Sequence, residues 1–127
     1  MLAPQEASDL LSSFNFSEID EIYTFNLPQE AIDNTSKTIA LITDTDTSLD
    51  YGNDDFYSKD REVELQIFYK LSPDFDPDEL ETKLLKYFIE NNWTIADIRG
   101  HILDPGTKQL TFTAYIDNTE FILRRDL

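Results

Sequence analysis

The stretch REVELQIFYK, residues 61–70, carries the most regular pattern in the chain. Apolar side chains occupy every second position from Val63 to Tyr69, and Glu62 begins the set of polar side chains between them. A period of two is the spacing of residues on one face of a β-strand. The stretch therefore predicts a strand of an antiparallel sheet with one face exposed at its start, and Phe68 departs from that polar face.

Two more strands are predicted before this one. Residues 38–43, TIALIT, form a short, β-branched apolar run that is typical of a strand covered on both faces. Residues 20–27 alternate as a strand does, and Pro28 stops the pattern. The polar residues 28–37 are predicted to form a loop with one helical turn.

Two helices are predicted from their end signals and their apolar spacing. The first begins at Pro4, which suits an initial helical position, and its apolar face comprises Ala7, Leu10, Leu11 and Phe14. The second has Asp76 as its N-cap and Pro77 as its first residue, and it ends at Asn91. Its predicted buried face comprises Leu80, Leu84, Leu85, Phe88 and Ile89.

The last strands are predicted to form a hairpin. Residues 93–103 and 110–116 are strand-like, and the sequence Asp104-Pro-Gly-Thr107 between them is typical of a turn. The order α-β-β-β-α-β-β predicts an α+β fold in a single domain spanning residues 1–127. The predicted fold has a mostly antiparallel (mixed) sheet of about five strands, with two helices on one face of the sheet. Residues 121–127 have no predicted place in it and form a possible extension.

Residues 44–60 are predicted to be a long polar connection. Six Asp residues lie in it, together with Tyr51, Phe56 and Tyr57. Long connections without secondary structure are uncommon in compact domains and are often functional. Aromatic residues are enriched in interface cores, so these rings either form an interface or fasten the loop to its own domain.

Charge and composition exclude several classes of function. The 127 residues contain 10 Lys and Arg against 26 Asp and Glu, which gives a formal charge of −16. This balance is opposite to that of a protein that binds the phosphate backbone, so no direct sequence-specific binding of nucleic acid is expected. The absence of Cys excludes disulfides and thiolate chemistry. We expect no signal peptide at the start and no membrane-spanning segment.

The sequence offers no pattern of a metal or catalytic site. Asp44 to Asp50 begins like a calcium loop, but Leu49 and Asp55 stand where the EF-hand needs Gly and Glu. No G-x-S-x-G nucleophile motif is present. His101, the single histidine, is interpreted as a structural or edge-strand residue. We therefore expect a non-enzymatic protein without cofactors.

Five segments together resemble one family of proteins: EIYTF at 21–25, ALITD at 40–44, YGNDDFY at 51–57, VELQIFYK at 63–70 and RGHILDP at 99–105. It is a family of small proteins from the tail-gene region of siphophages and their prophages in Gram-positive hosts. The resemblance runs from the first helix to the last strand. The family is similar to tail terminators and head–tail completion proteins, which are small α+β domains that assemble into hexameric rings.

The resemblance implies a structural protein of the virion tail or neck, assembled in the cytoplasm of the host bacterium. Its implied partners are further copies of itself, the tail tube protein and the head–tail connector protein. A ring subunit needs segments that reach its neighbour, and the connection 44–60 and the basic C-terminus are suitable. The interface candidates are Tyr51, Asn53, Asp54, Asp55, Phe56, Tyr57, Arg124 and Arg125.

A second function fits the same composition. A small acidic phage protein can mimic the charge of DNA and thereby inhibit a host nuclease or DNA-binding protein. Such an inhibitor would bind a basic partner with strong salt dependence. A ring subunit would instead associate with itself and remain in the virion.

Overall fold

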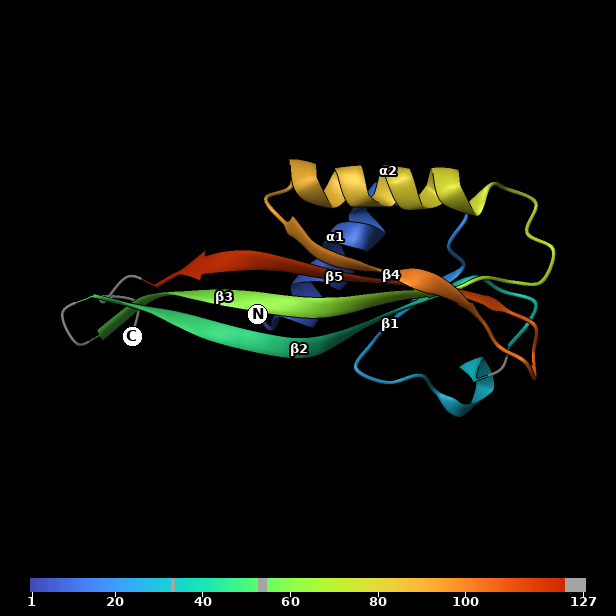
Figure 1. The fold of residues 1–127 in the computed structure, drawn as a ribbon, viewed down its shortest axis with the longest axis horizontal. Coiled ribbons are helices and arrows are strands. Elements are labelled where there is room, and N and C mark those ends of the chain that lie inside the picture. The colour runs from blue at the N-terminus through green and yellow to red at the C-terminus, as the bar shows by residue number, and fades with distance from the viewer. Residues whose placement is uncertain (33, 53–54, 123–127) are drawn as a thin grey trace.

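A computed structural model describes residues 1–32, 34–52 and 55–122, with the backbone alone for residues 55 and 56. The predicted α+β class, single domain and element order are confirmed. A short 3-10 turn, Gln29–Ala31, confirms the helical turn expected between the first two strands. The elements are α1 (Ala3–Phe14), β1 (Glu21–Thr24), β2 (Ile39–Gly52), β3 (Asp55–Phe68), α2 (Pro77–Glu90), β4 (Thr94–Leu103) and β5 (Leu110–Phe121) (Figure 1).

The five strands form one mixed sheet in the order β1-β2-β3-β5-β4. β1 and β2 are parallel, and the other three pairs are antiparallel. β3 lies in the middle and pairs with β2 on one edge and with β5 on the other. The predicted hairpin of β4 and β5 is confirmed, and its turn is closed by the Asp104 carboxylate, which accepts from the Gly106 amide at 2.8 Å.

The core lies between one face of this sheet and the two helices. The alternation that predicted β3 is confirmed, because Val63, Leu65 and Ile67 are fully buried. They belong to one apolar cluster with Leu11 of α1 and Leu84 of α2. The two helices therefore cover the same face of the sheet, and the opposite face stays largely open.

α2 begins where the sequence predicts, and Asp76 caps it by accepting from the Asp78 amide at 3.1 Å. The predicted burial of Ile89 is wrong, because its side chain is 55% exposed. Glu81 occupies the buried stripe instead. Hydrogen bonds with Tyr69 and His101 satisfy this buried carboxylate, and Ile89 lies on the outer side of the helix.

The largest correction concerns residues 44–60, which were predicted to be a loop. β2 continues to Gly52 and β3 begins at Asp55, so these residues form an extended hairpin. β5 also continues five residues past its predicted end, to Phe121, and pairs with this part of β3. These residues form strands because their backbones pair with neighbouring strands. Backbone pairing of exposed strands leaves no apolar pattern in the sequence.

β1 is shorter than predicted and ends at Thr24 instead of Leu27. Phe25 has a φ of 68°, in the left-handed region that side chains other than glycine and asparagine rarely adopt. This conformation turns the chain out of the sheet. The following segment then crosses the face opposite the helices, where the 3-10 turn lies below the sheet in Figure 1.

The packing between α2 and the sheet gives a direct test of this fold. Replacing the fully buried Leu84 with Ala removes apolar contacts and leaves a cavity, so we expect a loss of about 2–5 kcal/mol in the free energy of unfolding. Urea denaturation measures the loss. Ile89→Ala, on the same helix but exposed, is the control and should change stability by about 0.5 kcal/mol or less. Equal losses for the two variants would contradict the orientation of α2.

Candidate functional site

A three-stranded arm extends from the domain beyond the helices (Figure 1). We define the arm as residues 44–52 of β2, 55–62 of β3 and 117–121 of β5. At about 3.3 Å per residue, its β2 strand is roughly 30 Å long. Residues 44–49 of β2 are exposed, so this part of the arm contributes little to the core.

The end of the arm carries large apolar side chains in contact with solvent. Tyr51 is 66% exposed, Tyr57 53%, Phe121 73% and Leu49 38%. We call these four residues the arm tip. The alternative that the aromatic side chains fasten a loop to its own domain does not hold for Tyr51 and Tyr57. Isolated exposed apolar residues are ordinary, but several at the end of one projection indicate an interaction site.

The other predicted interface residues are only partly within the described structure. Asn53, Asp54, Arg124 and Arg125 lie outside the described residues, and so do the side chains of Asp55 and Phe56. Sequence reasoning missed Leu49 and Phe121. The alternation of Leu49 with Tyr51 was the available signal, but the polar residues around them hid it.

Arg61 fixes the root of the arm, the end where it joins the rest of the domain, to α1. Its side chain is only 6% exposed, and its Nη2 donates to Glu6 Oε2 at 2.7 Å. Its Nη1 donates to the carbonyl of Met1, and its Nε donates to Asn118 Oδ1 at 3.2 Å. A buried guanidinium needs several acceptors, and here they come from the start of the chain and from β5.

An acidic row crosses the arm on the sheet face opposite the helices. The register places Asp46, Glu62 and Asp117 side by side on three neighbouring strands, and strands are spaced about 4.8 Å apart. Partial burial, together with the charges of Glu62 and Asp60, raises the pKa of Asp117 above its usual value. Like charges this close destabilise the arm, so the row carries a cost in stability.

The described residues contain no group of three or more acidic or histidine side chains placed to hold a metal ion. The start of the suspected calcium loop, Asp44 to Asp50, is instead a strand of the arm. Asp46 pairs with Glu62 and Asp50 with Ser58, four residues apart along the strand, which separates these two carboxylates by about 13 Å.

A polar cluster around the buried Glu81 carboxylate joins α2 to the sheet. Glu81 accepts a hydrogen bond from the Tyr69 hydroxyl at 2.7 Å, and its Oε2 lies 2.8 Å from His101 Nε2. Burial and the neighbouring Glu81 carboxylate raise the pKa of Tyr69. His101 lies on β4, the edge strand, and packs against the Phe112 ring with 5.7 Å between centroids. The cluster fastens three elements together, and the structural interpretation of His101 accounts for its contacts.

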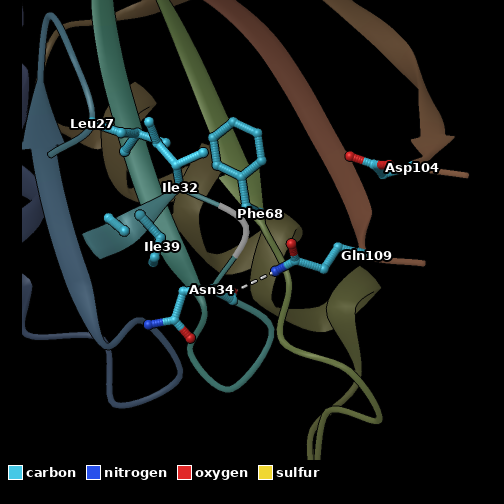
Figure 2. Close-up of a pocket in the computed structure, with 8 residues that line it drawn as sticks. Leu27, Ile32, Asn34, Ile39, Phe68, Asp104 and Gln109 are labelled. Atoms are coloured by element: carbon cyan, nitrogen blue, oxygen red, sulfur yellow. Dashed lines mark hydrogen bonds between the residues drawn. The ribbon is translucent and has the colours of Figure 1, made fainter. Parts of the chain in front are cut away.

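An apolar pocket opens on the sheet face opposite the helices, at the end away from the arm. Its volume is about 190 Å³ (Figure 2). Ile39 and Phe68, which are paired across β2 and β3, form its floor. Leu27 and Ile32 cover it from the segment after β1, and Gln109 Nε2 holds that segment by donating to the Asn34 carbonyl at 2.8 Å. The remaining lining residues are Ala31 and Asp104.

Phe68 was the sequence signal for this pocket. It breaks the polar face of the strand at 61–70, and the structure shows why: its ring lies under the segment that crosses from β1 to β2. An apolar residue on an otherwise polar strand face indicates that something covers that face locally.

Comparison with known protein families places this chain in one of them. Residues 2–120 match the family model described as "Protein of unknown function (DUF806)". No curated protein matches the chain. Neither helix of the described structure is long and apolar enough to cross a membrane.

Arg61 offers a test of how the arm is held. Arg61→Met keeps the length of the side chain but removes its hydrogen bonds to Glu6, Met1 and Asn118. We expect a loss of about 1–3 kcal/mol in unfolding free energy and faster amide hydrogen exchange at the root of the arm. Lys37→Met is the control, because its ion pair with Glu21 is exposed and lies outside the arm. Unchanged exchange in Arg61→Met would show that the arm does not depend on this contact.

The acidic row predicts a pH-dependent gain in stability. Because the pKa of Asp117 is raised in the folded state, the folded protein binds this proton more readily than the unfolded chain does. The contribution of Asp117 is therefore most favourable at low pH and is lost as pH rises through the raised pKa. Asp117→Asn should raise the melting temperature by a few degrees at pH 7, and the gain should vanish below about pH 4.

The control for this test is Asp9→Asn, which also removes one negative charge but lies on the exposed side of α1. Scanning calorimetry at several pH values measures both variants. An equal gain from Asp9→Asn would mean that net charge, and not the acidic row, is responsible.

Proposed function

We propose that this chain, which belongs to the DUF806 family, is a non-enzymatic structural subunit of a siphophage virion. In this role it is a tail terminator or tail-completion protein. A hexameric ring of it caps the tail tube and joins the tube to the head–tail connector. The resemblance of the five sequence segments named above leads to this proposal.

The arm is the observation that supports the proposal most. The domain has a complete core beneath its two helices, and the arm adds little to that core. A three-stranded projection with exposed aromatic side chains suits contact with another protein subunit. Ring assembly requires such a contact, because each subunit must reach the next one.

The acidic row fits a ring through which DNA passes. Carboxylates repel the phosphate backbone, so a wall that carries Asp46, Glu62 and Asp117 would let DNA move without binding. Each additional copy in a ring would add a further formal charge of −16. The cost in stability at Asp117 is understandable if these charges serve the assembled state.

The acidic row also favours the alternative, an inhibitor that mimics DNA. Rows of carboxylates on an open sheet face can present negative charge to a basic protein surface. The two functions differ in what the exposed aromatic side chains do. An inhibitor of this type binds through charge, whereas a ring subunit also needs its arm tip.

Native mass and virion morphology test the proposal. We expect light scattering to show a ring when the purified chain is mixed with the tail tube protein of its own phage. A phage with the gene deleted should show overlong tails, or tailless heads beside detached tails, in electron micrographs. Normal virions from the deletion phage would refute the proposal. A monomer that does not bind tail tubes but binds a basic host protein in low salt would support the inhibitor function instead.

A further inference from the structure

Two apolar surfaces lie at opposite ends of the sheet, and neither is covered within one copy of the chain. One is the arm tip, and the other is the apolar pocket with its surroundings (Figures 1 and 2). Ile32 at the pocket is 47% exposed, and Ile102 on β4 lies in the same row of the sheet as Phe68. Because the arm points away from the pocket, the tip of a chain cannot fill its own pocket.

We infer that the arm tip of one copy docks into the apolar pocket of a second copy. This inference rests on the self-assembly within the proposed function and names the surfaces that would carry it. An interface between two different surfaces is heterologous, and repeating it closes a ring when the rotation between subunits allows. One arm and one pocket per chain are therefore sufficient for every subunit of such a ring.

The size of the pocket fits an aromatic side chain. Ordinary small-molecule sites have volumes of about 300–1,000 Å³, so about 190 Å³ is small for a ligand. A cavity of about 150 Å³ accommodates a benzene ring. The apolar floor of Ile39 and Phe68 and the exposed Ile32 at the entrance give such a ring apolar partners. One ring of the arm tip therefore fits the pocket in volume, and the apolar part of the lining gives it contacts beside the polar residues Asn34, Asp104 and Gln109.

The available area also fits an association between copies. A buried aromatic side chain removes about 150–250 Å² from water, so the exposed parts of Tyr51, Tyr57 and Phe121 offer roughly 400 Å² in total. A standard interface buries about 800 Å² per partner. The tip thus supplies at most about half of a standard interface, because Phe121 pairs with Ser58 and therefore lies on the other face of the sheet from Tyr57. The flanks of the arm lie beside the tip to supply the remainder.

The absence of Cys from the chain makes a cross-linking test direct. One chain carries Tyr51→Cys and a second carries Ile32→Cys, and the two are mixed with the tail tube protein under mild oxidation. We expect a disulfide between the two chains in at least ten-fold higher yield than with the control. The control replaces Ile32→Cys with Ile89→Cys, whose position is at least as exposed but lies on α2. Equal yields for the two mixtures would overturn the inference.

A second pair of variants tests the same contact without oxidation. Ile32→Asp places a charge at the pocket entrance and should lower the fraction of assembled rings at least ten-fold, while Ile89→Asp should leave it unchanged. Circular dichroism of both variants checks that they fold. If rings form on tubes and neither the cross-link nor Ile32→Asp has its effect, the docking contact is wrong and the proposed function stands. If the cross-link forms but the chain does not bind tail tubes, the docking contact stands and the proposed function is wrong.

Discussion

The pairing of β3 along both of its edges is the constraint on which the rest of this structure depends. Its backbone is paired with β2 from Asp55 to Phe68 and with β5 from Ser58 to Phe68. In the domain body this pairing places Val63, Leu65 and Ile67 beneath the helices. In the arm beyond Arg61 the same pairing continues without a covering helix, so backbone hydrogen bonds rather than apolar burial hold the strands together.

The environment of β3 changes from one end to the other, and the candidate functions follow that change. At Phe68 the strand is covered on the face opposite the helices, and this cover creates the apolar pocket. In its middle only the helix face is covered. At its beginning neither face is covered by a helix, and the arm tip is exposed. A single strand thus connects the two surfaces that we propose to meet between neighbouring copies.

Charge limits what this open architecture can do. The outer edge of β2 in the arm has no partner strand among the described residues, and such an edge invites aggregation through strand pairing. Asp44, Asp46 and Asp50 lie along it and oppose such pairing through their charge. Arg61, almost completely buried at the root, provides an opposite charge where the arm meets α1. The acidic composition therefore fits a protein that associates through a limited apolar contact.

The sequence by itself determined those elements whose signals act over a few neighbouring residues. The alternation of residues 61–70 predicted the buried face of β3, because a sheet covered on one side selects every second residue for burial. Asp76 and Pro77 predicted the start of α2, because capping and a fixed φ act within a few residues. Composition alone excluded disulfides, and the net negative charge opposes binding to a phosphate backbone. Tertiary structure decided the arm, the orientation of Ile89 and the pocket. Residues 44–52 form a strand only because β3 pairs with them, and in the arm β3 in turn pairs with β5 residues that are 55 to 63 positions away in the sequence. Such partners are distant in sequence, and neither face of the arm carries the apolar period that burial would impose.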